Sequence, residues 1–229
     1  MPCQELVAPL SETETVARNF YDRWIGRSGM VSFLGRLIFS LSGVVYSGPF
    51  IRAARLTPGD HVLELGCGLG TILTVTQKRT GSTATYLGLD LSHQMVRHGR
   101  RKMAGSFVFR PVELLVASAL SLPVREAIFD VVLLSHIIKY LTDEQLRLVL
   151  EETKRVLKPG GRMVLWEFRP VATLSFTRLI LRCCKAQKLR SSAELRAALE
   201  ATGCTSVSSF RVITPWLPWS NVAFTVTIV

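Results

Sequence analysis

The chain has 229 residues, with 28 lysines and arginines against 17 acids and a formal net charge of +11. This length suits one α/β domain with a sizeable core, and an apolar content of 48% excludes a disordered or fibrous chain. The basic balance predicts an anionic partner, such as nucleic acid, a lipid surface or an acidic substrate.

The chain begins with a polar segment that lacks the apolar core of a signal peptide. Residues 11–26 are predicted to form a helix capped by Ser11 or Thr13, with Val16, Phe20 and Trp24 on one stripe.

The five cysteines are odd in number and show no metal-ligand spacing. We therefore expect no bound metal and a reducing, cytoplasmic environment.

The next segment, residues 30–55, is long enough to suggest a membrane span. Arg36 lies within it, however, and serines and glycines dilute its apolar character. We predict an amphipathic helical region, interrupted at Gly43 and at Gly48–Pro49. Residues 1–55 are therefore expected to form a helical cap, or substrate lid, on a core of residues 56–229 within a single domain.

The core alternates strands with helices. Buried strands are predicted at residues 61–65, 85–89, 112–117, 128–134 and 162–168, with helices at 71–79, 92–102, 143–157 and 193–202. The last two strands, 205–212 and 222–228, are joined by only about nine residues, which is too short for a parallel crossover. The pattern predicts an α/β, Rossmann-like, doubly wound seven-stranded sheet, mostly parallel with an antiparallel last strand.

The stretch Val62–Gly70 carries the clearest chemical signal. Its strand ends in three glycines at alternate positions, and a helix follows at once, which is typical of a nucleotide site. Glu64 lies two residues before the first glycine, where a carboxylate disfavours a pyrophosphate and favours a cationic ligand. Asp90 supplies a carboxylate for two ribose hydroxyls, which NAD also carries, so Asp90 alone does not discriminate between the two cofactors and Glu64 with the compressed glycine loop does. S-adenosylmethionine, with an ammonium and a sulfonium, fits both acids.

These motifs resemble those of class I S-adenosylmethionine-dependent methyltransferases, in general layout the enzymes of quinone and lipid biosynthesis. The likeness covers residues 56–229 and is specific for fold and cofactor, but not for substrate. Its matching segments are Val62–Gly70, Tyr86–Ser92 with Met95, Ala119–Pro123, Phe129–His136 and Arg155–Gly161.

The resemblance implies a set of cofactor-binding residues: Glu64, Gly66, Gly68 and Gly70 for the methionine end, Asp90 for the ribose, Leu91, Met95, Ser118 and Ala119 for the adenine, Ser135 for the floor, and Tyr21 for the cover. Position 118 departs from the family, which often has aspartate there to accept from the adenine amino group. Serine accepts that hydrogen bond more weakly.

Methyl transfer from a sulfonium requires alignment and exclusion of water, and a base only where the acceptor is protonated. His136, just past the fourth strand, is the first candidate base, and Tyr140 is the second. The alternative for His136 is a packing role beside the cofactor. The Asn/Asp-Pro-Pro-aromatic turn of amino-methylating nucleic-acid enzymes is absent, since residues 134–137 read Leu-Ser-His-Ile.

Three apolar segments, residues 1–55, 169–190 and 213–219, should surround the site and favour a hydrophobic small-molecule acceptor such as a quinone precursor or a lipid. Arg178, Arg182 and Lys185 occur at helical spacing and suggest peripheral contact with an anionic membrane, or else a solvated face. An RNA or protein methyltransferase is the first alternative, although the basic clusters lack the interleaved aromatics that bind nucleic acid. A non-catalytic cofactor-binding module is the second.

Overall fold

The computed structural model describes residues 9–26, 29–80, 84–105, 112–170, 182, 185–204, 206–212 and 221–227. These residues build a seven-stranded sheet with the order β3-β2-β1-β4-β5-β7-β6. The strands are β1 (His61–Leu65), β2 (Thr85–Asp90), β3 (Val112–Val116), β4 (Phe129–Ser135), β5 (Leu157–Phe168), β6 (Ser206–Val212) and β7 (Asn221–Thr227).

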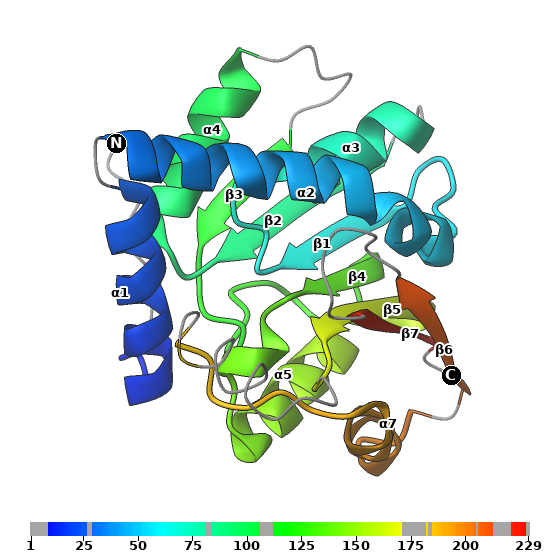
Figure 1. The fold of residues 1–229 in the computed structure, drawn as a ribbon. Coiled ribbons are helices and arrows are strands. Elements are labelled where there is room, and N and C mark those ends of the chain that lie inside the picture. Colours follow the sequence, from blue (N-terminus) through cyan, green and yellow to red (C-terminus); the bar gives the residue numbers. More distant parts are fainter. Residues whose placement is uncertain are drawn as a thin grey trace.

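Helices cover both faces of this sheet (Figure 1). They are α1 (Glu12–Gly26), α2 (Met30–Ala54), α3 (Thr71–Thr80), α4 (His93–Ala104), the short 3-10 helix η1 (Ile138–Tyr140), α5 (Asp143–Val156) and α7 (Ser192–Ala201). Alternate residues of the strands face two separate apolar clusters. One cluster joins the sheet to α2, α3 and α4, and the other joins it to η1, α5 and α7.

The strand pairing places the ligand edge of the sheet. Strand β1 pairs in parallel with β2 on one side and with β4 on the other. The chain therefore adds β2 and β3 on one side of β1 and the later strands on the other side. Ligands of such sheets bind beyond the carboxyl ends of the strands at this switch point. Strand β7 is antiparallel to both β5 and β6. The predicted fold class, including its antiparallel last strand, is confirmed.

Local signals set the helix starts. Ser92 Oγ accepts from the Met95 amide at 3.1 Å at the start of α4. Thr142 with Gln145, and Ser191 with Glu194, form reciprocal capping boxes at the starts of α5 and α7. These caps satisfy backbone N–H groups that a helix leaves unpaired, and they hold the loops that precede each helix.

Three local predictions were wrong. Helix α2 runs unbroken from Met30 to Ala54 with Pro49 inside it, because Phe50, Ile51 and Ala54 are buried on the sheet and offset the lost hydrogen bond. Strand β5 begins at Leu157, five residues before the expected start, with an irregular register opposite Phe129–Val131.

The third wrong prediction concerns α1. Val16 is exposed and does not belong to an inward stripe, and the buried positions are Glu14, Ala17 and Ile25.

Two predicted segments lie mostly outside the described residues. Arg178 and residues 213–219 are not described, so the basic amphipathic insertion and the aromatic loop stay predictions. Across the part of the chain that is described, no helix combines the length and the apolar character that crossing a membrane requires.

Candidate functional site

The glycine loop after β1 is the centre of the site. Gly66, Gly68 and Gly70 all have positive φ, at 75°, 53° and 66°. The amides of Gly66 and Cys67 both donate to the Leu89 carbonyl, at 2.8 and 3.1 Å, which joins the loop to the end of β2. A Cβ on Gly66 would lie 2.0 Å from the Ile137 side chain. Only glycine fits this close approach between the loop and the segment that follows β4.

Glu64 lies beneath this loop with only 1% of its surface exposed. Ser135 Oγ, at the end of β4, donates to Glu64 Oε1 at 2.7 Å. Among the residues that the structure describes, the buried Oε2 has no partner within hydrogen-bond geometry, although the Leu73 amide of α3 is near enough to Glu64 to lower its pKa. Burial raises the pKa of Glu64 to about 8, with the hydrogen bond from Ser135 opposing this rise and the charge of Asp90 adding to it. A buried acceptor of this kind favours a cation.

Asp90 terminates β2 beside the same loop. Its Oδ2 accepts from the Gly68 amide at 2.9 Å, and its Oδ1 accepts from the Ser92 amide at 2.8 Å. Burial raises the pKa of Asp90 to about 6, although both backbone bonds lower it. Each carboxylate oxygen has a second lone pair, so the group can still accept two hydroxyl hydrogen bonds.

Helix α1 packs over the glycine loop. Ile25 packs with Leu69 of the glycine loop and with Met95 of α4, and Tyr21 lies against this small cluster. Tyr21 Oη and Tyr140 Oη are 2.7 Å apart and share a hydrogen bond. Two residues predicted for separate roles, cover and base, therefore bind each other.

Asp22, which sequence reasoning missed, fixes the other side of α1. Its Oδ1 accepts from Ser92 Oγ at 2.6 Å and from the Gln94 amide at 3.1 Å. The start of α4, which follows Asp90, is thereby tied to the cover helix.

Ser118, after β3, contacts a second residue that sequence reasoning missed. Its hydroxyl donates to Glu14 Oε1 of α1, and its Oγ accepts from the Leu120 amide at 3.0 Å. Glu14 Oε2 accepts from the amide and hydroxyl of Ser11, which makes Glu14 part of the helix cap. Glu14 is buried, with 5% of its surface exposed. A carboxylate is thus present at this corner, although position 118 itself is serine.

His136 lies at the end of β4 with φ at 58°. Its ring lies between Trp166 and Phe168, with ring centroids 4.5 and 4.4 Å away. His136 Nδ1 is 3.5 Å from Glu167 Oε1, and 27% of the histidine side chain is exposed. Desolvation lowers the pKa of His136 despite the nearby Glu167, so the imidazole is neutral at pH 7 and can accept a proton.

Glu167 also faces Lys139, whose Nζ is 3.5 Å from Oε1. The Lys139 amide donates to Glu167 Oε2 at 3.0 Å. Although burial acts to raise the pKa of Glu167, the charge of Lys139 and the contacts with His136 outweigh it and lower the pKa to about 2. The carboxylate is therefore ionised at every working pH. Sequence reasoning missed both residues; the signal was the position of Glu167 at the carboxyl end of β5, next to β4.

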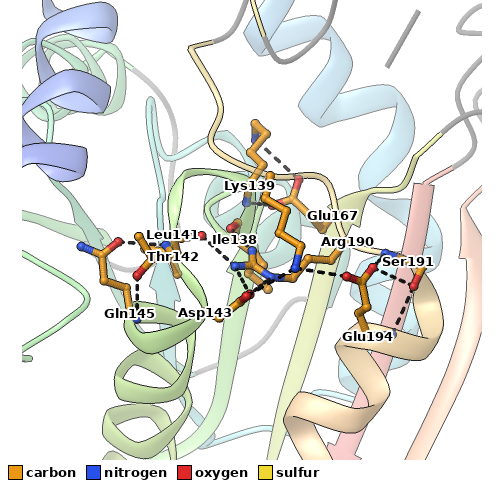
Figure 2. A network of polar contacts seen from close by, with 11 residues as sticks. Ile138, Lys139, Leu141, Thr142, Asp143, Gln145, Glu167, Arg190, Ser191 and Glu194 are labelled. Atoms are coloured by element: carbon orange, nitrogen blue, oxygen red, sulfur yellow. Dashed lines mark hydrogen bonds and ion pairs between the residues drawn. The ribbon is translucent and has the colours of Figure 1, made fainter. Parts of the chain in front are cut away.

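A polar network behind the site holds η1 in place (Figure 2). The buried Arg190 donates to the carbonyls of Ile138 and Leu141, at 2.9 and 2.8 Å, and to Asp143 Oδ1 at 2.7 Å. These bonds flank Tyr140 on both sides. The arrangement fixes the segment between β4 and α5, which carries both predicted candidate bases.

The structure thus gathers most of the predicted site residues at one edge of the sheet. Direct contacts join Glu64 to Ser135, Gly68 to Asp90 and Tyr21 to Tyr140. The remaining predicted residues have less specific contacts: Met95 is buried beside the glycine loop, and Leu91 and Ala119 are half-buried. Their cofactor roles stay predictions.

Comparison with known proteins finds similarity to methyltransferases. Residues 62–161 match the family model described as a methyltransferase domain. The chain is 30% identical over 131 residues to demethylmenaquinone methyltransferase from Symbiobacterium thermophilum, covering 57% of this chain and 50% of that protein. It is 32% identical over 121 residues to the ubiquinone/menaquinone biosynthesis C-methyltransferase UbiE of Hydrogenovibrio crunogenus, covering 53% and 47%. The chain thus spans about half the length of the curated relatives it matches.

The fold matches solved structures over a larger share of the chain. Geranyl diphosphate C-methyltransferase from Streptomyces coelicolor superposes with a TM-score of 0.73 at 14% identity, covering 97% of this chain and 100% of that one. A phosphoethanolamine N-methyltransferase from Haemonchus contortus gives 0.68 at 16% identity, covering 93% and 60%. Residues 62–161 thus match a methyltransferase domain, the curated relatives named above are methyltransferases, and the solved structures share the fold of this chain, which is the similarity that the resemblance to class I S-adenosylmethionine-dependent methyltransferases predicts.

Proposed function

We propose that this chain binds S-adenosylmethionine at the carboxyl ends of β1 and β2 and transfers its methyl group to a hydrophobic small molecule. The observation that carries the proposal is the buried Glu64, with an oxygen that lacks a partner among the described residues. Such an oxygen is costly unless a ligand supplies a donor, and the ammonium of S-adenosylmethionine is a charged one.

The residues at this edge fit the other parts of the cofactor. The glycine loop permits close approach of the methionine end, since no Cβ projects from Gly66, Gly68 or Gly70. Asp90 can accept from the two ribose hydroxyls, since each of its oxygens accepts only one backbone hydrogen bond. Ser118 and Glu14 form a polar edge at the loop after β3, where the resemblance expects the adenine. Met95 packs beside the glycine loop, against Leu69.

When bound, the sulfonium of S-adenosylmethionine supplies an activated methyl group. The protein then has to align the acceptor and exclude water, and α1 serves both purposes because it covers the glycine loop. If the acceptor carries a proton at the attacked atom, His136 is the base that we favour. Its neutral ring can take that proton at Nε2 while Glu167 stabilises the resulting charge through Nδ1.

A prenylated or lipid-like acceptor is supported by the relatives. Curated relatives are named for demethylmenaquinone and for ubiquinone/menaquinone biosynthesis, and a structural neighbour was solved with geranyl diphosphate. Phe168, which is half-buried beside His136, supplies apolar surface for such a molecule. We infer that the acceptor is a quinone precursor or a similar prenyl or lipid compound.

Two measurements test this proposal. Calorimetry should detect S-adenosylmethionine but not NAD, and Asp90→Asn should weaken that binding at least tenfold. Asp130→Asn is the matched control, because Asp130 also accepts a backbone N–H, from His61, but at the amino end of the strands. Transfer of a labelled methyl group should then be followed into quinone precursors, lipid extract, RNA and protein. Incorporation into RNA or protein alone would overturn the acceptor class, and binding without any transfer would favour a binding module.

A further inference from the structure

Helix α2 exposes large apolar side chains on the side that faces away from the rest of the protein. Its exposed large side chains recur at helical spacing and form one stripe along the outer surface, named here the apolar stripe: Met30, Phe33, Leu34, Leu37, Leu41 and Val44. Their exposed fractions run from 42% for Leu37 to 73% for Met30. Contiguous exposed apolar surface of this kind marks an interaction site.

On the opposite side of the same helix segment, three described residues contact or face the protein. Ser32 is buried, and Gly35 lies so close to Trp24 of α1 that an added Cβ would be 3.1 Å from the indole ring. The Arg36 guanidinium donates to the Ile25 carbonyl at 2.7 Å. These contacts hold α2 against α1 with the apolar stripe facing outward.

Cations surround the stripe. Helices α2, α3 and α4 contain no aspartate or glutamate, and five of their eight lysines and arginines form a rim, named here the basic rim: Lys78, Arg79, Arg97, Arg101 and Lys102. Two of its members contact the stripe helix directly. Arg79 donates to the Val44 carbonyl at 3.4 Å, and Lys102 donates to Ser40 Oγ at 3.1 Å.

Members of the rim also crowd one another. The pKa of Lys102 is lowered by burial and by the charge of Lys78. The pKa of His98 is lowered by burial and by Arg36, Arg97 and Arg101. A partner with negative charge would relieve this repulsion.

We propose that the apolar stripe and the basic rim form a docking surface for an anionic lipid bilayer. The stripe would enter the boundary between headgroups and acyl chains while the rim contacts lipid phosphates, which is the division of roles in a helix that lies in the interface. A second copy of this chain fits less well, since a two-fold interface would set one basic rim against the other.

The role of this docking surface rests on the proposed function. If the acceptor is dissolved in a membrane, the surface brings the enzyme to it. Helix α2 follows α1 directly, and α1 covers the cofactor loop (Figure 1). A bilayer on α2 therefore lies on the helical cap of the site.

Co-sedimentation with vesicles tests the surface without cofactor or acceptor. The wild type should bind phosphatidylcholine vesicles that contain phosphatidylglycerol. It should bind vesicles of phosphatidylcholine alone much more weakly. The triple variant Phe33→Ser/Leu37→Ser/Leu41→Ser should lose at least tenfold in partitioning. Its control is Ile128→Ser, an exposed apolar residue outside the stripe, which should stay within twofold.

The charge arm uses Arg97→Gln/Arg101→Gln, which should weaken binding and flatten its dependence on salt. Arg125→Gln/Arg147→Gln removes the same charge elsewhere and should change little. Circular dichroism melting checks that each variant folds. The inference is overturned if the wild type does not bind anionic vesicles, if the triple variant binds as well as the wild type, or if ultracentrifugation finds a dimer that the triple variant abolishes.

A last comparison separates this inference from the proposed function. The triple variant should methylate an acceptor dispersed in detergent at the wild-type rate, but turn over the same acceptor in vesicles more slowly. Vesicle binding without any methyl transfer would refute the proposed function and leave the docking surface standing. Methyl transfer to the dispersed acceptor without vesicle binding would do the reverse.

Discussion

At the scale of single residues, Glu64 is the group for which function and stability conflict. Its pKa in an unfolded chain is 4.5, and burial raises it to about 8 in the folded protein. Between these values the folded state holds a proton that the unfolded state has lost. The free energy of unfolding therefore falls as pH rises through this interval, and a cationic ligand recovers the loss because it favours the ionised carboxylate.

We expect Glu64→Gln to remove this pH dependence. In the wild type, affinity for S-adenosylmethionine should rise from pH 6 to pH 8, by up to about tenfold per pH unit, because the proton must leave before the ammonium binds. The variant should bind weakly at both pH values but unfold at a higher temperature than the wild type at pH 8. Calorimetry and thermal melts at both pH values measure this.

Methylthioadenosine, which has no ammonium, is the control ligand for Glu64. Its affinity should not follow the titration of Glu64 in this range. An equal pH slope for both ligands would place the ammonium elsewhere.

Glu14 supplies the carboxylate that position 118 lacks. We expect Glu14→Gln to weaken S-adenosylmethionine binding roughly tenfold to a hundredfold, since a hydrogen bond to a charged group contributes about 1.5–3 kcal/mol. The variant should also discriminate less between S-adenosylhomocysteine and its inosine analogue, whose base lacks the amino group. The exposed Glu12 of the same helix gives the control, Glu12→Gln. Unchanged discrimination would exclude Glu14 from the adenine edge.

His136 tests the choice between a base and a packing residue. If it takes a proton from the acceptor, His136→Gln should lower kcat by about 10²–10⁴ and change the Kd for S-adenosylmethionine little. The wild-type rate should fall at low pH as the imidazole gains a proton, at a pH below its ordinary pKa, because burial lowers that pKa. A variant that instead loses cofactor affinity and keeps kcat would support the packing role. Single-turnover rates across pH separate the two outcomes.

At the scale of elements, Arg190 fixes the segment that carries Tyr140. We expect Arg190→Ala to lower the free energy of unfolding by about 2–4 kcal/mol, because two buried carbonyls lose their donor. Asp143→Asn should cost less than about 1 kcal/mol, since the Asp143 side chain is 72% exposed. Urea denaturation measures both. Equal losses in the two variants would show that the ion pair, not the carbonyl contacts, stabilises η1.

Element positions were largely predictable because buried strands are short apolar runs ended by turn residues. Strand β1 was predicted at 61–65 and is His61–Leu65. The failures arose where tertiary contacts outweighed a local signal. Pro49 suggested a break, but burial of Phe50 keeps α2 whole, and the predicted strand start at residue 162 lies five residues inside what is strand β5.

The candidate site divides in the same way. The glycine loop with Glu64 and Asp90 could be predicted because its residues follow one another along two neighbouring strands. Glu14 and Ser118 are 104 residues apart in sequence, and Tyr21 and Tyr140 are 119 apart. No local pattern links such pairs, since only the packing of α1 across the sheet edge brings them together.

At the scale of the whole molecule, charge is unevenly distributed. The net charge of +11 is concentrated where α2, α3 and α4 carry no acid, whereas α5 alone contains Asp143, Glu144, Glu151 and Glu152. The basic side also carries the exposed apolar stripe. This asymmetry gives the molecule one side suited to an anionic surface. Composition predicted an anionic partner, but it did not indicate which side of the molecule would carry the charge.

Helix α1 connects the part of the site around β1 and β2 with the part around β4 and η1. It contacts the start of α4 through Asp22, the glycine loop through Ile25, and η1 through Tyr21. We expect S-adenosylhomocysteine to slow hydrogen exchange of the α1 amides, because a ligand beneath the helix adds contacts to both halves at once. Hydrogen-exchange mass spectrometry should record this slowing in residues 12–26 and in the glycine loop. Strand β6, at the far end of the sheet, is the internal control and should not change. Protection of the loop with none in α1 would mean that the helix covers the site without closing on the cofactor.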